Sequence, residues 1–536
     1  MKERHQVAKK TSQRRANLLE AIVIITGRLA VAAKLVVTAC LAASAAAAQS
    51  AEPLVLSSAV IRGSNVYDHA ELFPVYRDHL GKPISQAQVR AIAGAIAERY
   101  AADGYPRPQI RLDDDLVAFG VLRIDIYETR IGGVSVKGNP GPHRERLETL
   151  GARLQAHDVL KQSDLHRTLR QMRDLPGLTL SATTTAESPT PSLYVLDLET
   201  EFQAVSGVVR VTNRGTDEAG PNFLLGQLMA NGLFGGQTSL GLSFGAAFDY
   251  GEYRGMGVLA NRRIGIDGLV LSLSAFRSRA NPHEAPVDRE DRFVRDRVKL
   301  GATKRFARTG GDVLSLTAAL DLEDLVIFRE VAALRDERLR MLELSAHRSW
   351  RGAGSSQYAA GFDVVKGLGG LGSGLNAADL TADPRRADFL LLRATTTRVT
   401  RINEAWSWRL DALAQHTADV LPYGERFKIG GDRLGRGFEV PEIAGDQGIG
   451  AKVELRRRLR ELTTPESSLS AYAFYDIGAT FKQDAPGRES AATSGVGIRL
   501  QGRRMSGSLE LAKPLTHADV EGRRDLSAFA EITVRL

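Results

Sequence analysis

The chain has 536 residues, of which 25% are charged and 6% aromatic, and its formal net charge is +8. This length exceeds that of one ordinary soluble core, and the composition is not that of a disordered chain. Eight Lys or Arg residues and two Glu residues lie within residues 1–48, so this segment accounts for most of the net charge. Because the rest of the chain carries little net charge, a nucleic-acid partner is not expected.

Residues 1–48 have the order of a secretory signal peptide: a basic part, then an apolar part that ends in small residues. We place cleavage after Ala48. A transmembrane helix needs about 18–20 apolar residues, and Arg28 and Lys34 interrupt this stretch. Cys40 is the only cysteine of the chain, so a lipidation site is the alternative to ordinary cleavage. After ordinary cleavage the chain has no thiol for a disulfide or a metal site.

Residues 54–202 contain an internal repeat in which helical and strand patterns alternate. The short apolar run VIRG ends at Gly63, the similar run VSVKG ends at Gly138, and a helical pattern follows each of them. The spacing of apolar residues predicts the order β-α-α-β-β for each copy. The two copies cover residues 54–128 and 129–202.

The first copy has clear helix boundaries. Ser85 and Gln88 have the spacing of a capping box, and Gly104 lies where a helix C-cap is expected. A unit of this kind leaves a short sheet edge to which an extended chain can add a strand. Two small α+β domains without such a role are the alternative.

Residues 204–536 have a different pattern, in which apolar residues alternate with small or polar ones. Four segments show it most clearly: residues 240–250, 314–322, 406–415 and 528–536. A membrane-spanning strand needs about 9–11 residues, with apolar side chains facing lipid and polar ones facing the lumen. At about 20 residues for a strand and its connection, the segment contains about 16 strands. The predicted fold is a transmembrane antiparallel β-barrel preceded by two α+β domains; a large soluble β-sandwich or propeller is the alternative.

Two motifs lie in the last third of the chain. The segment GERFKIGGDRLGRGFEVPEIAGDQGIGAKVELR contains Gly430-Gly431, Arg436-Gly437-Phe438 and a strand with Glu454. The second motif, FYDIG, contains Phe474, Asp476 and Gly478. Together they resemble the signature of two-partner secretion transporters of the haemolysin secretion/activation type, whose superfamily includes the outer-membrane assembly factors. Gly435 stands where that family usually has Val.

This resemblance implies that the two N-terminal units are periplasmic POTRA domains and that the barrel lies in the outer membrane. It also implies that the loop folds back into the barrel, where Arg436 meets Asp476. Strand alternation independently predicts that Tyr475 faces lipid and Asp476 faces the lumen. The Arg guanidinium can bind a carboxylate with two hydrogen bonds, and Gly435 and Gly437 would let the backbone turn tightly.

We therefore predict a loop lock in the lumen, formed by Arg436, Gly437, Phe438 and Asp476. Gly430, Gly431, Glu454, Phe474 and Gly478 are the supporting motif residues. The alternative is that Arg436 is a solvated loop residue and Asp476 an ordinary lumen acid. Reversing either charge, with Arg436→Asp or Asp476→Arg, should abolish export, and the double variant should restore it.

The resemblance further implies a function as a translocase that binds one unfolded secreted partner, a large adhesin-like or haemolysin-like protein, and exports it through the lumen. An assembly factor of the same superfamily and a passive porin are the alternatives. The sequence has no H-E-x-x-H, G-x-S-x-G or P-loop motif in a convincing context. We expect no enzymatic activity, no cofactor, no metal site and no nucleic-acid partner, and we expect a monomeric barrel in contact with outer-membrane lipid.

Overall fold

A computed structural model describes residues 55–113, 119–187, 191–216, 220–265, 268–282, 291–307, 311–329, 332–377, 383–438, 443–516 and 525–536. Residues 1–48, which the sequence assigns to a signal peptide, lie outside the described residues. The chain divides into two compact units. The first contains the residues up to Asp103 and Arg107–Glu128, and the second contains Gly104–Pro106 and Thr129–Leu536. Within the described ranges, no helix is long and apolar enough to span a membrane.

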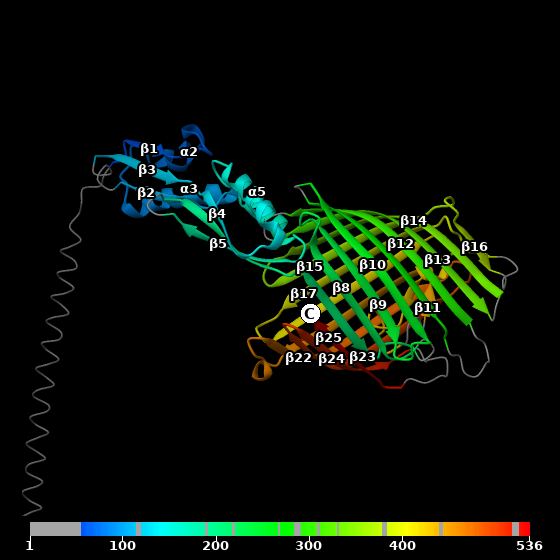
Figure 1. The fold of residues 1–536 in the computed structure, drawn as a ribbon. Helices are drawn as coiled ribbons and strands as arrows, with labels where there is room; N and C mark the ends of the chain where they lie inside the picture. Colours follow the sequence, from blue (N-terminus) through cyan, green and yellow to red (C-terminus); the bar gives the residue numbers. More distant parts are fainter. Residues whose placement is uncertain are drawn as a thin grey trace, which may run out of the picture. The chain divides into compact units, whose positions relative to one another are not determined.

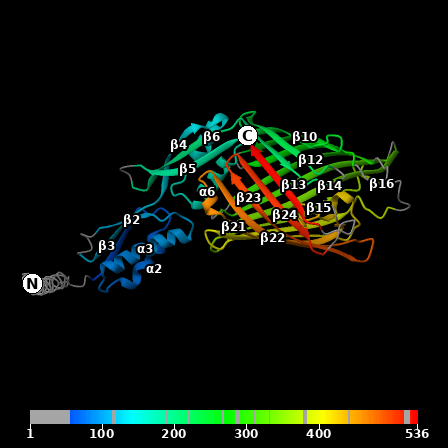
Figure 2. The same ribbon diagram turned by 90° about the horizontal axis from the view of Figure 1, so that it is seen from below.

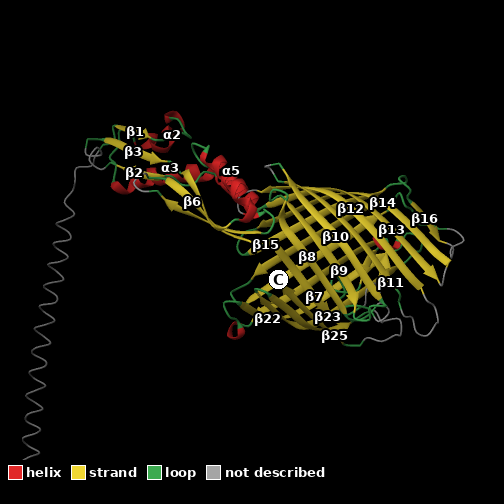
Figure 3. Cartoon of the chain, viewed as in Figure 1, coloured by secondary structure: helices red, strands yellow, loops and turns green. Residues whose placement is uncertain are grey.

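The first unit is a small sheet with two α-helices, which Figure 3 shows in yellow and red. Its elements are β1 (Ser58–Arg62), α2 (His69–Tyr76), α3 (Gln86–Ala102), β2 (Gln109–Leu112) and β3 (Val121–Tyr127). The strand order is β1-β3-β2, with β1 parallel and β2 antiparallel to β3. The predicted order β-α-α-β-β is therefore confirmed for the first copy.

The boundaries of α3 follow from its sequence. The Ser85 side chain accepts a hydrogen bond from the backbone of Gln88, and the Gln88 side chain accepts one from the backbone of Ser85. Gly104 has a φ of +84° just after the helix, a conformation that favours glycine. Ile92 and Ile96 lie on the buried face of this helix. The capping box and the glycine stop that the sequence predicts are thus both present.

The second copy of the repeat has the same order of elements. They are β4 (Arg130–Asn139), α5 (Arg144–Gln155), α6 (Gln162–Arg173), β5 (Leu178–Ala186) and β6 (Leu193–Phe202). The strand order is β4-β6-β5, with β6 in the centre, parallel to β4 and antiparallel to β5. Leu147, Leu150 and Met172 of the two helices pack on Leu196 and Leu198 of β6. The sheet therefore has its core on one face and leaves β4 and β5 at its edges.

The rest of the second unit is one closed antiparallel barrel of sixteen strands. The strands of the wall are β7 (Val205–Thr212), β8 (Phe223–Leu233), β9 (Thr238–Ala247), β10 (Tyr253–Ile264), β11 (Leu269–Ala280), β12 (Asp291–Ala307), β13 (Val313–Arg329), β14 (Ala332–Arg351), β15 (Ser356–Gly367), β17 (Leu390–Arg401), β18 (Trp406–Thr417), β21 (Gln447–Arg458), β22 (Ser467–Phe481), β23 (Arg488–Gly502), β24 (Met505–Pro514) and β25 (Ser527–Arg535). A short additional strand, β16 (Gly374–Ala377), pairs with β14 beyond the end of β15. The predicted barrel of about 16 strands is confirmed.

The barrel is closed by pairing between its first and last strands. β25 pairs with β7 from Glu531↔Thr212 to Arg535↔Val208. Figures 1 and 2 show the strands crossing the wall obliquely and returning to β25 and the C-terminus. Closure gives each wall strand two paired neighbours, so backbone hydrogen bonds are made without water. An open sandwich or a propeller, the alternative that the sequence left, does not have this topology.

Side chains alternate between the two faces of the wall, as the sequence predicts. Leu242 and Phe244 of β9 are 60% and 45% exposed on the outer face. Ser239 on the same strand is 6% exposed and faces inward, where Asn231 accepts a hydrogen bond from it. Apolar groups outside and polar groups inside are typical of a barrel in lipid.

Within the second unit, the α+β domain packs against one end of the barrel through a buried histidine. His143 is 0% exposed and its Nε2–H donates to the carbonyl oxygen of Pro176 at 2.8 Å. Gly236 in the β8–β9 turn is so close that a Cβ there would lie 2.9 Å from His143 Nδ1. Burial lowers the pKa of His143, because a charged imidazolium is poorly solvated there.

We expect this contact to weaken in acid. In the folded protein the pKa of His143 lies below the ordinary histidine value of about 6.5. The stabilisation by neutral His143 is therefore complete above pH 6.5, and it falls as the pH drops from 6.5 toward the folded pKa. The hydrogen-exchange protection factors of the turn at residues 234–237, which correct for the intrinsic pH dependence of exchange, should therefore fall below that pH. The His143→Leu variant should lose this pH dependence; if it keeps it, another group controls the contact.

Candidate functional site in the barrel lumen

The connection between β18 and β21 folds into the barrel instead of leaving it. It contains a short hairpin of β19 (Phe427–Ile429) and β20 (Ile443–Gly445), paired from Phe427↔Gly445 to Ile429↔Ile443. Its apolar side chains form one buried cluster with Ala491 of the wall strand β23: Phe427, Ile429, Leu434, Phe438 and Ile443. We call residues 421–438 and 443–446 the lumen loop. Burial of its apolar side chains against the wall holds it inside the barrel.

The apex of the lumen loop contacts the wall through Arg436 and Asp476. Arg436 Nε donates to Asp476 Oδ2 at 3.0 Å and Nη2 donates to Oδ1 at 2.8 Å. The backbone N–H groups of Gly435 and Arg436 also donate to Oδ2, each at 3.2 Å. Asp476 is 0% and Arg436 6% exposed, so this pair is buried and bidentate. The structure thus brings together the two residues that the sequence selected.

Two further carboxylates surround the same guanidinium. Arg436 Nη1 lies 3.3 Å from Glu454 Oε2 on β21 and 3.3 Å from Glu510 Oε2 on β24. The guanidinium carbon lies 3.5 Å from the centre of the Phe474 ring, a cation–π contact. Arg436 therefore contacts carboxylates on three wall strands, β21, β22 and β24, and its role is not limited to the pair with Asp476.

The surrounding carboxylates have cationic or hydroxyl partners of their own. Arg456 donates to Glu454 at 2.7 Å and Arg499 donates to it at 3.2 Å. Glu510 accepts from the Tyr472 hydroxyl at 2.9 Å and pairs with Arg214, which follows β7. Buried charges are tolerated when each has partners and hydrogen bonds. The whole group forms one connected polar network around the loop apex.

Gly437 and Gly435 have different structural roles. Gly435 has a φ of +84°, which a β-branched residue such as Val avoids. Gly437 has an ordinary φ, and a Cβ there would lie 3.1 Å from the backbone nitrogen of Pro514 on β24. The expected tight turn is present, because the Phe438 N–H donates to the Gly435 carbonyl at 3.0 Å across Arg436 and Gly437. The smallness of Gly437 also permits close approach to the wall.

The remaining motif residues shape the same apex. The Gly430 N–H donates to the Leu434 carbonyl at 2.8 Å, and the Gly431 N–H donates to the Phe438 carbonyl at 2.9 Å. Phe438 itself is 4% exposed and belongs to the buried cluster. These bonds close the apex on itself, so the guanidinium of Arg436 is presented from a fixed backbone.

Leu434 is the contact that motif matching missed. It is 0% exposed, and Cβ atoms at Gly450 and Gly478 would lie 2.3 and 2.9 Å from its Cδ2. The two glycines therefore form a groove in the wall that receives this side chain. In the family, Val usually stands at the position of Gly435. Here the apolar contact with the wall is made by Leu434, one residue earlier. The sequence signal was available: Leu434 is the apolar residue beside Gly435 in the run DRLGRGF.

Glu510 is the second residue that the sequence reasoning missed. It lies between Leu509 and Leu511, which are 56% and 43% exposed on the outer face. The alternation that placed Asp476 in the lumen would have placed Glu510 there too. Alternation does not identify which inward acid meets Arg436, because that depends on strand order around the barrel.

The base of the lumen loop is held by Asp446. This carboxylate is 0% exposed and accepts hydrogen bonds from the backbone N–H groups of Leu421 and Gln483, each at 2.8 Å. Gln415 Nε2 donates to the Asp446 carbonyl at 3.0 Å. Asp446 thus fixes the point at which the loop returns to the wall.

Replacing Asp446 with alanine should loosen the base of the loop. The buried N–H of Leu421 and the partly buried N–H of Gln483 would lose their acceptor, and an unsatisfied buried group costs about 1–3 kcal/mol. We expect faster hydrogen exchange at Leu421 and Gln483 and easier proteolysis of the loop, with the barrel still folded. Asp446→Asn keeps one acceptor oxygen and should show a smaller effect; equal effects of the two variants would argue against this role.

Within the described ranges, no group of three or more His, Cys, Asp or Glu side chains is placed to hold a metal ion. Three features define the class of this protein as a POTRA-plus-barrel outer-membrane transporter. They are a closed lipid-facing barrel, N-terminal α+β units and an inward loop held by a buried arginine. The chain belongs to the haemolysin secretion/activation protein ShlB/FhaC/HecB family, whose model matches residues 196–500. The model of the ShlB-type POTRA domain matches residues 54–129. The barrel therefore lies in the outer membrane and the POTRA domains lie in the periplasm.

Solved structures with a similar fold include two transporters. CdiB from Escherichia coli is 19% identical, with a TM-score of 0.74, and the match covers 91% of this chain and 92% of that one. CdiB from Acinetobacter baumannii is 17% identical, with a TM-score of 0.63 and 91% of each chain covered. BamA from Haemophilus ducreyi lacking POTRA domains 1–3 is 12% identical, with a TM-score of 0.50, over 90% of this chain and 100% of that one. Comparison with curated proteins gives no match.

Proposed function

We propose that this transporter binds one unfolded secreted protein in the periplasm and exports it through the barrel lumen, as in two-partner secretion. In this proposal residues 1–48 are a signal peptide that is removed, and residues 54–128 and 129–202 are partner-binding domains. Residues 204–536 are the conduit. The observation that carries the proposal is the lumen loop, which occupies the interior of a closed barrel and is attached to the wall by a small number of buried contacts.

The lumen loop supports export because it can control the width of the route. Its apex is held by Arg436 and Leu434, and its base by Asp446. A loop held by discrete contacts at each end has a defined bound position and can be displaced without unfolding the wall. We propose that Arg436 and Asp476, with Gly437 and Phe438, form the lock that sets the conducting geometry.

The edge strand β5 supports binding of an unfolded partner. Its hydrogen bonds run to β6 on one side, and no second strand pairs with it among the described residues. Thr183, Thr184 and Thr185 are exposed along it, and β-branched residues favour strand pairing. An extended segment of the partner can add to this edge as a further strand.

Membership of the secretion family favours export over the two alternatives. The fold shared with BamA is compatible with an assembly role, but a shared fold does not define function. A passive porin would need neither POTRA domains nor an edge strand for an unfolded chain. We also expect the barrel to act as a monomer, without a cofactor or enzymatic activity.

The test of export uses a candidate partner encoded in an adjacent reading frame. We expect this protein on the cell surface or in the medium when the transporter is present, and trapped in the periplasm when the gene is deleted. Equal secretion in both strains would contradict the proposal. Assembly defects in unrelated outer-membrane proteins after deletion would support the assembly alternative instead.

A pair of proline substitutions tests the role of β5. Neighbouring residues of an edge strand direct their N–H groups alternately to the paired strand and to the open edge. Of Thr183→Pro and Thr184→Pro, one should therefore remove an outward donor and reduce partner binding about tenfold or more. The other should break a β5–β6 hydrogen bond and lower the melting temperature of the domain. Unchanged partner binding by both variants would exclude this edge as the docking strand.

A further inference from the structure

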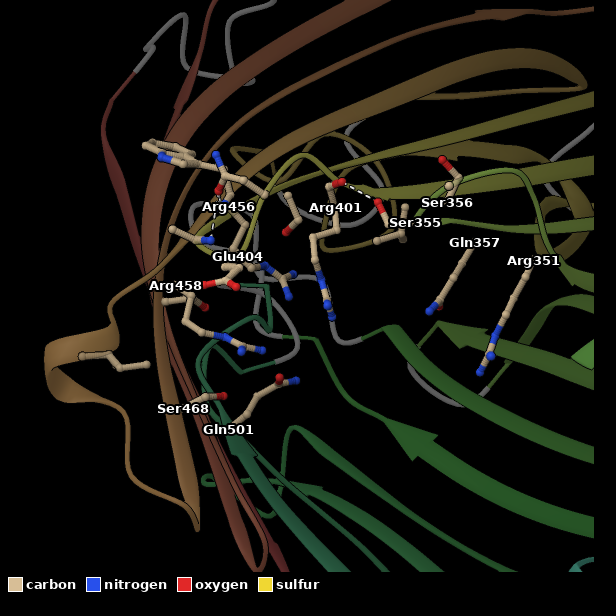
Figure 4. A pocket seen from close by; sticks show the side chains of 18 residues that line it. Arg351, Ser355, Ser356, Gln357, Arg401, Glu404, Arg456, Arg458, Ser468 and Gln501 are labelled. Atoms are coloured by element: carbon tan, nitrogen blue, oxygen red, sulfur yellow. Dashed lines mark hydrogen bonds between the residues drawn. The ribbon is translucent and has the colours of Figure 1, made fainter. Parts of the chain in front are cut away.

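The barrel has an arginine-rich pocket at its periplasmic end, where β7 begins. The pocket has a volume of about 390 Å³, and its lining includes Arg351, Arg401, Arg456 and Arg458. These residues lie at the ends of β14, β17 and β21. Figure 4 shows the side chains of Arg401 and Arg458 extending into the same space. We call these four residues with the space between them the entry pocket.

The register of the wall places these arginines close together. Ser407 on β18 pairs with Arg401 on one side and with Arg456 on the other. Since neighbouring strands lie about 4.8 Å apart, the backbones of these two arginines lie about 10 Å apart. Arg458 follows two residues later on the same strand and therefore points to the same face as Arg456.

Most of this positive charge is not neutralised. Within the described part of the chain, Arg351, Arg401 and Arg458 form no ion pair, and all three are exposed. Glu404 is the carboxylate among the lining residues, and it pairs with Arg460 and is attracted by Arg401 at longer range. The entry pocket therefore has a surplus of cationic groups facing water.

Other lumen arginines differ in this respect. Arg297 contacts Asp321 at 2.5 Å, and Arg409 contacts Asp411 at 2.7 Å. At the same end of the barrel, Arg305 is paired with Asp174 of the second α+β domain at 3.4 Å. The entry pocket therefore differs from these paired sites, and its concave wall strengthens the field of its unpaired arginines.

Most of the other side chains in the lining are polar. Eight residues of the lining carry hydroxyl or amide side chains, among them Ser355, Gln357, Asn403 and Gln501. Such groups can bond the backbone of an extended chain, and guanidinium groups bind carboxylates with two parallel hydrogen bonds. The lining therefore suits a polar, anionic and extended ligand.

We propose that the entry pocket binds Asp and Glu side chains of an extended polypeptide as it enters the barrel, an inference that rests on the proposed export function. The position at the periplasmic end of the lumen and the hydroxyl and amide lining favour a polypeptide over a free inorganic anion. Arg456 also donates to Glu454, which contacts Arg436. An acidic segment that binds Arg456 therefore competes with a carboxylate of the loop network.

The test measures binding of fluorescent Gly-Ser peptides to the purified full chain in detergent. A peptide carrying several Glu residues should bind about tenfold or more tightly than its Gln counterpart at low ionic strength, and high salt should remove the difference. The triple variant Arg351→Gln, Arg401→Gln, Arg458→Gln should lose the preference. Arg457→Gln is the matched control, because Arg457 belongs to the same strand but packs over Trp406 on the outer wall.

Equal binding of the Glu and Gln peptides, or an unchanged preference in the triple variant, would overturn the inference. Inorganic phosphate that binds while the peptides show no preference would identify an anion site and overturn it too. Heat-modifiable migration in gels checks that each variant retains a folded barrel. The secretion assay is separate: a Glu preference without export would contradict the proposed function and leave the entry pocket standing.

Discussion

Replacing Arg436 with alanine is expected to detach the apex of the lumen loop and to abolish export. Asp476 would remain buried, at 0% exposure, without its ion pair to Arg436, and breaking a buried ion pair in this way costs about 3–5 kcal/mol. The N–H groups of Gly435 and Arg436 now donate to Asp476. We therefore expect much faster hydrogen exchange at both positions, together with loss of the partner from the medium.

Arg433 provides the matched control for this variant. It lies in the same loop and carries the same charge, but it is exposed. Arg433→Ala should export normally and show no change in exchange at the apex. Arg436→Lys tests geometry, since Lys keeps the charge but lacks the planar fork. Normal export by Arg436→Ala in a folded barrel would refute the proposed lock.

The charge exchange that the sequence suggests is no longer expected to restore export. An Asp at position 436 would face Arg at position 476, but Glu454 and Glu510 now lie 3.3 Å from the guanidinium of Arg436. The exchanged loop would place a carboxylate beside two other carboxylates, which is unfavourable in a buried site. We therefore expect the double variant to remain defective, and full rescue would show that Glu454 and Glu510 contribute little.

Replacing Leu434 with alanine is expected to have the second largest effect. Truncating a fully buried leucine costs about 2–5 kcal/mol, and here the contact that is lost joins the loop to the wall at Gly450 and Gly478. The barrel strands themselves should be unaffected. We expect the loop to become sensitive to protease while gel mobility of the barrel stays heat-modifiable.

A double-mutant cycle with Gly450→Ala tests this contact directly. A Cβ at Gly450 would lie 2.3 Å from Leu434 Cδ2, so the single variant should displace the side chain and weaken the apex. In the presence of Leu434→Ala the added methyl group has space, and the two effects should be clearly less than additive. Additive effects would show that Leu434 does not occupy this groove.

Much of the fold was determined by local pattern. Alternation in segments such as residues 240–250 depends only on each strand having one face toward lipid and one toward water. The capping box at Ser85 and Gln88 and the glycine at position 104 are likewise local. Each of these features depends on neighbours within a few residues, and for that reason the sequence predicted them correctly.

The candidate site could be predicted only in part. Strand alternation placed Asp476 in the lumen, and the family motif paired it with Arg436. The sequence did not identify Glu510 as a further partner or Leu434 as the apolar contact. The contacts of Glu510 and Leu434 depend on which strands lie near β22 in the closed barrel. They also depend on where the apex of the lumen loop meets those strands.

The sequence by itself determined that this protein has a lipid-facing barrel, two β-α-α-β-β units and an inward-facing acid on the strand of Asp476. Only the tertiary structure decided that Arg436 meets three carboxylates and that unpaired arginines gather at the periplasmic entrance. The physical reason is that these contacts join residues that lie far apart in the sequence. Side-chain direction follows from a period of two residues, whereas charge neutralisation depends on strands brought together by closure of the barrel.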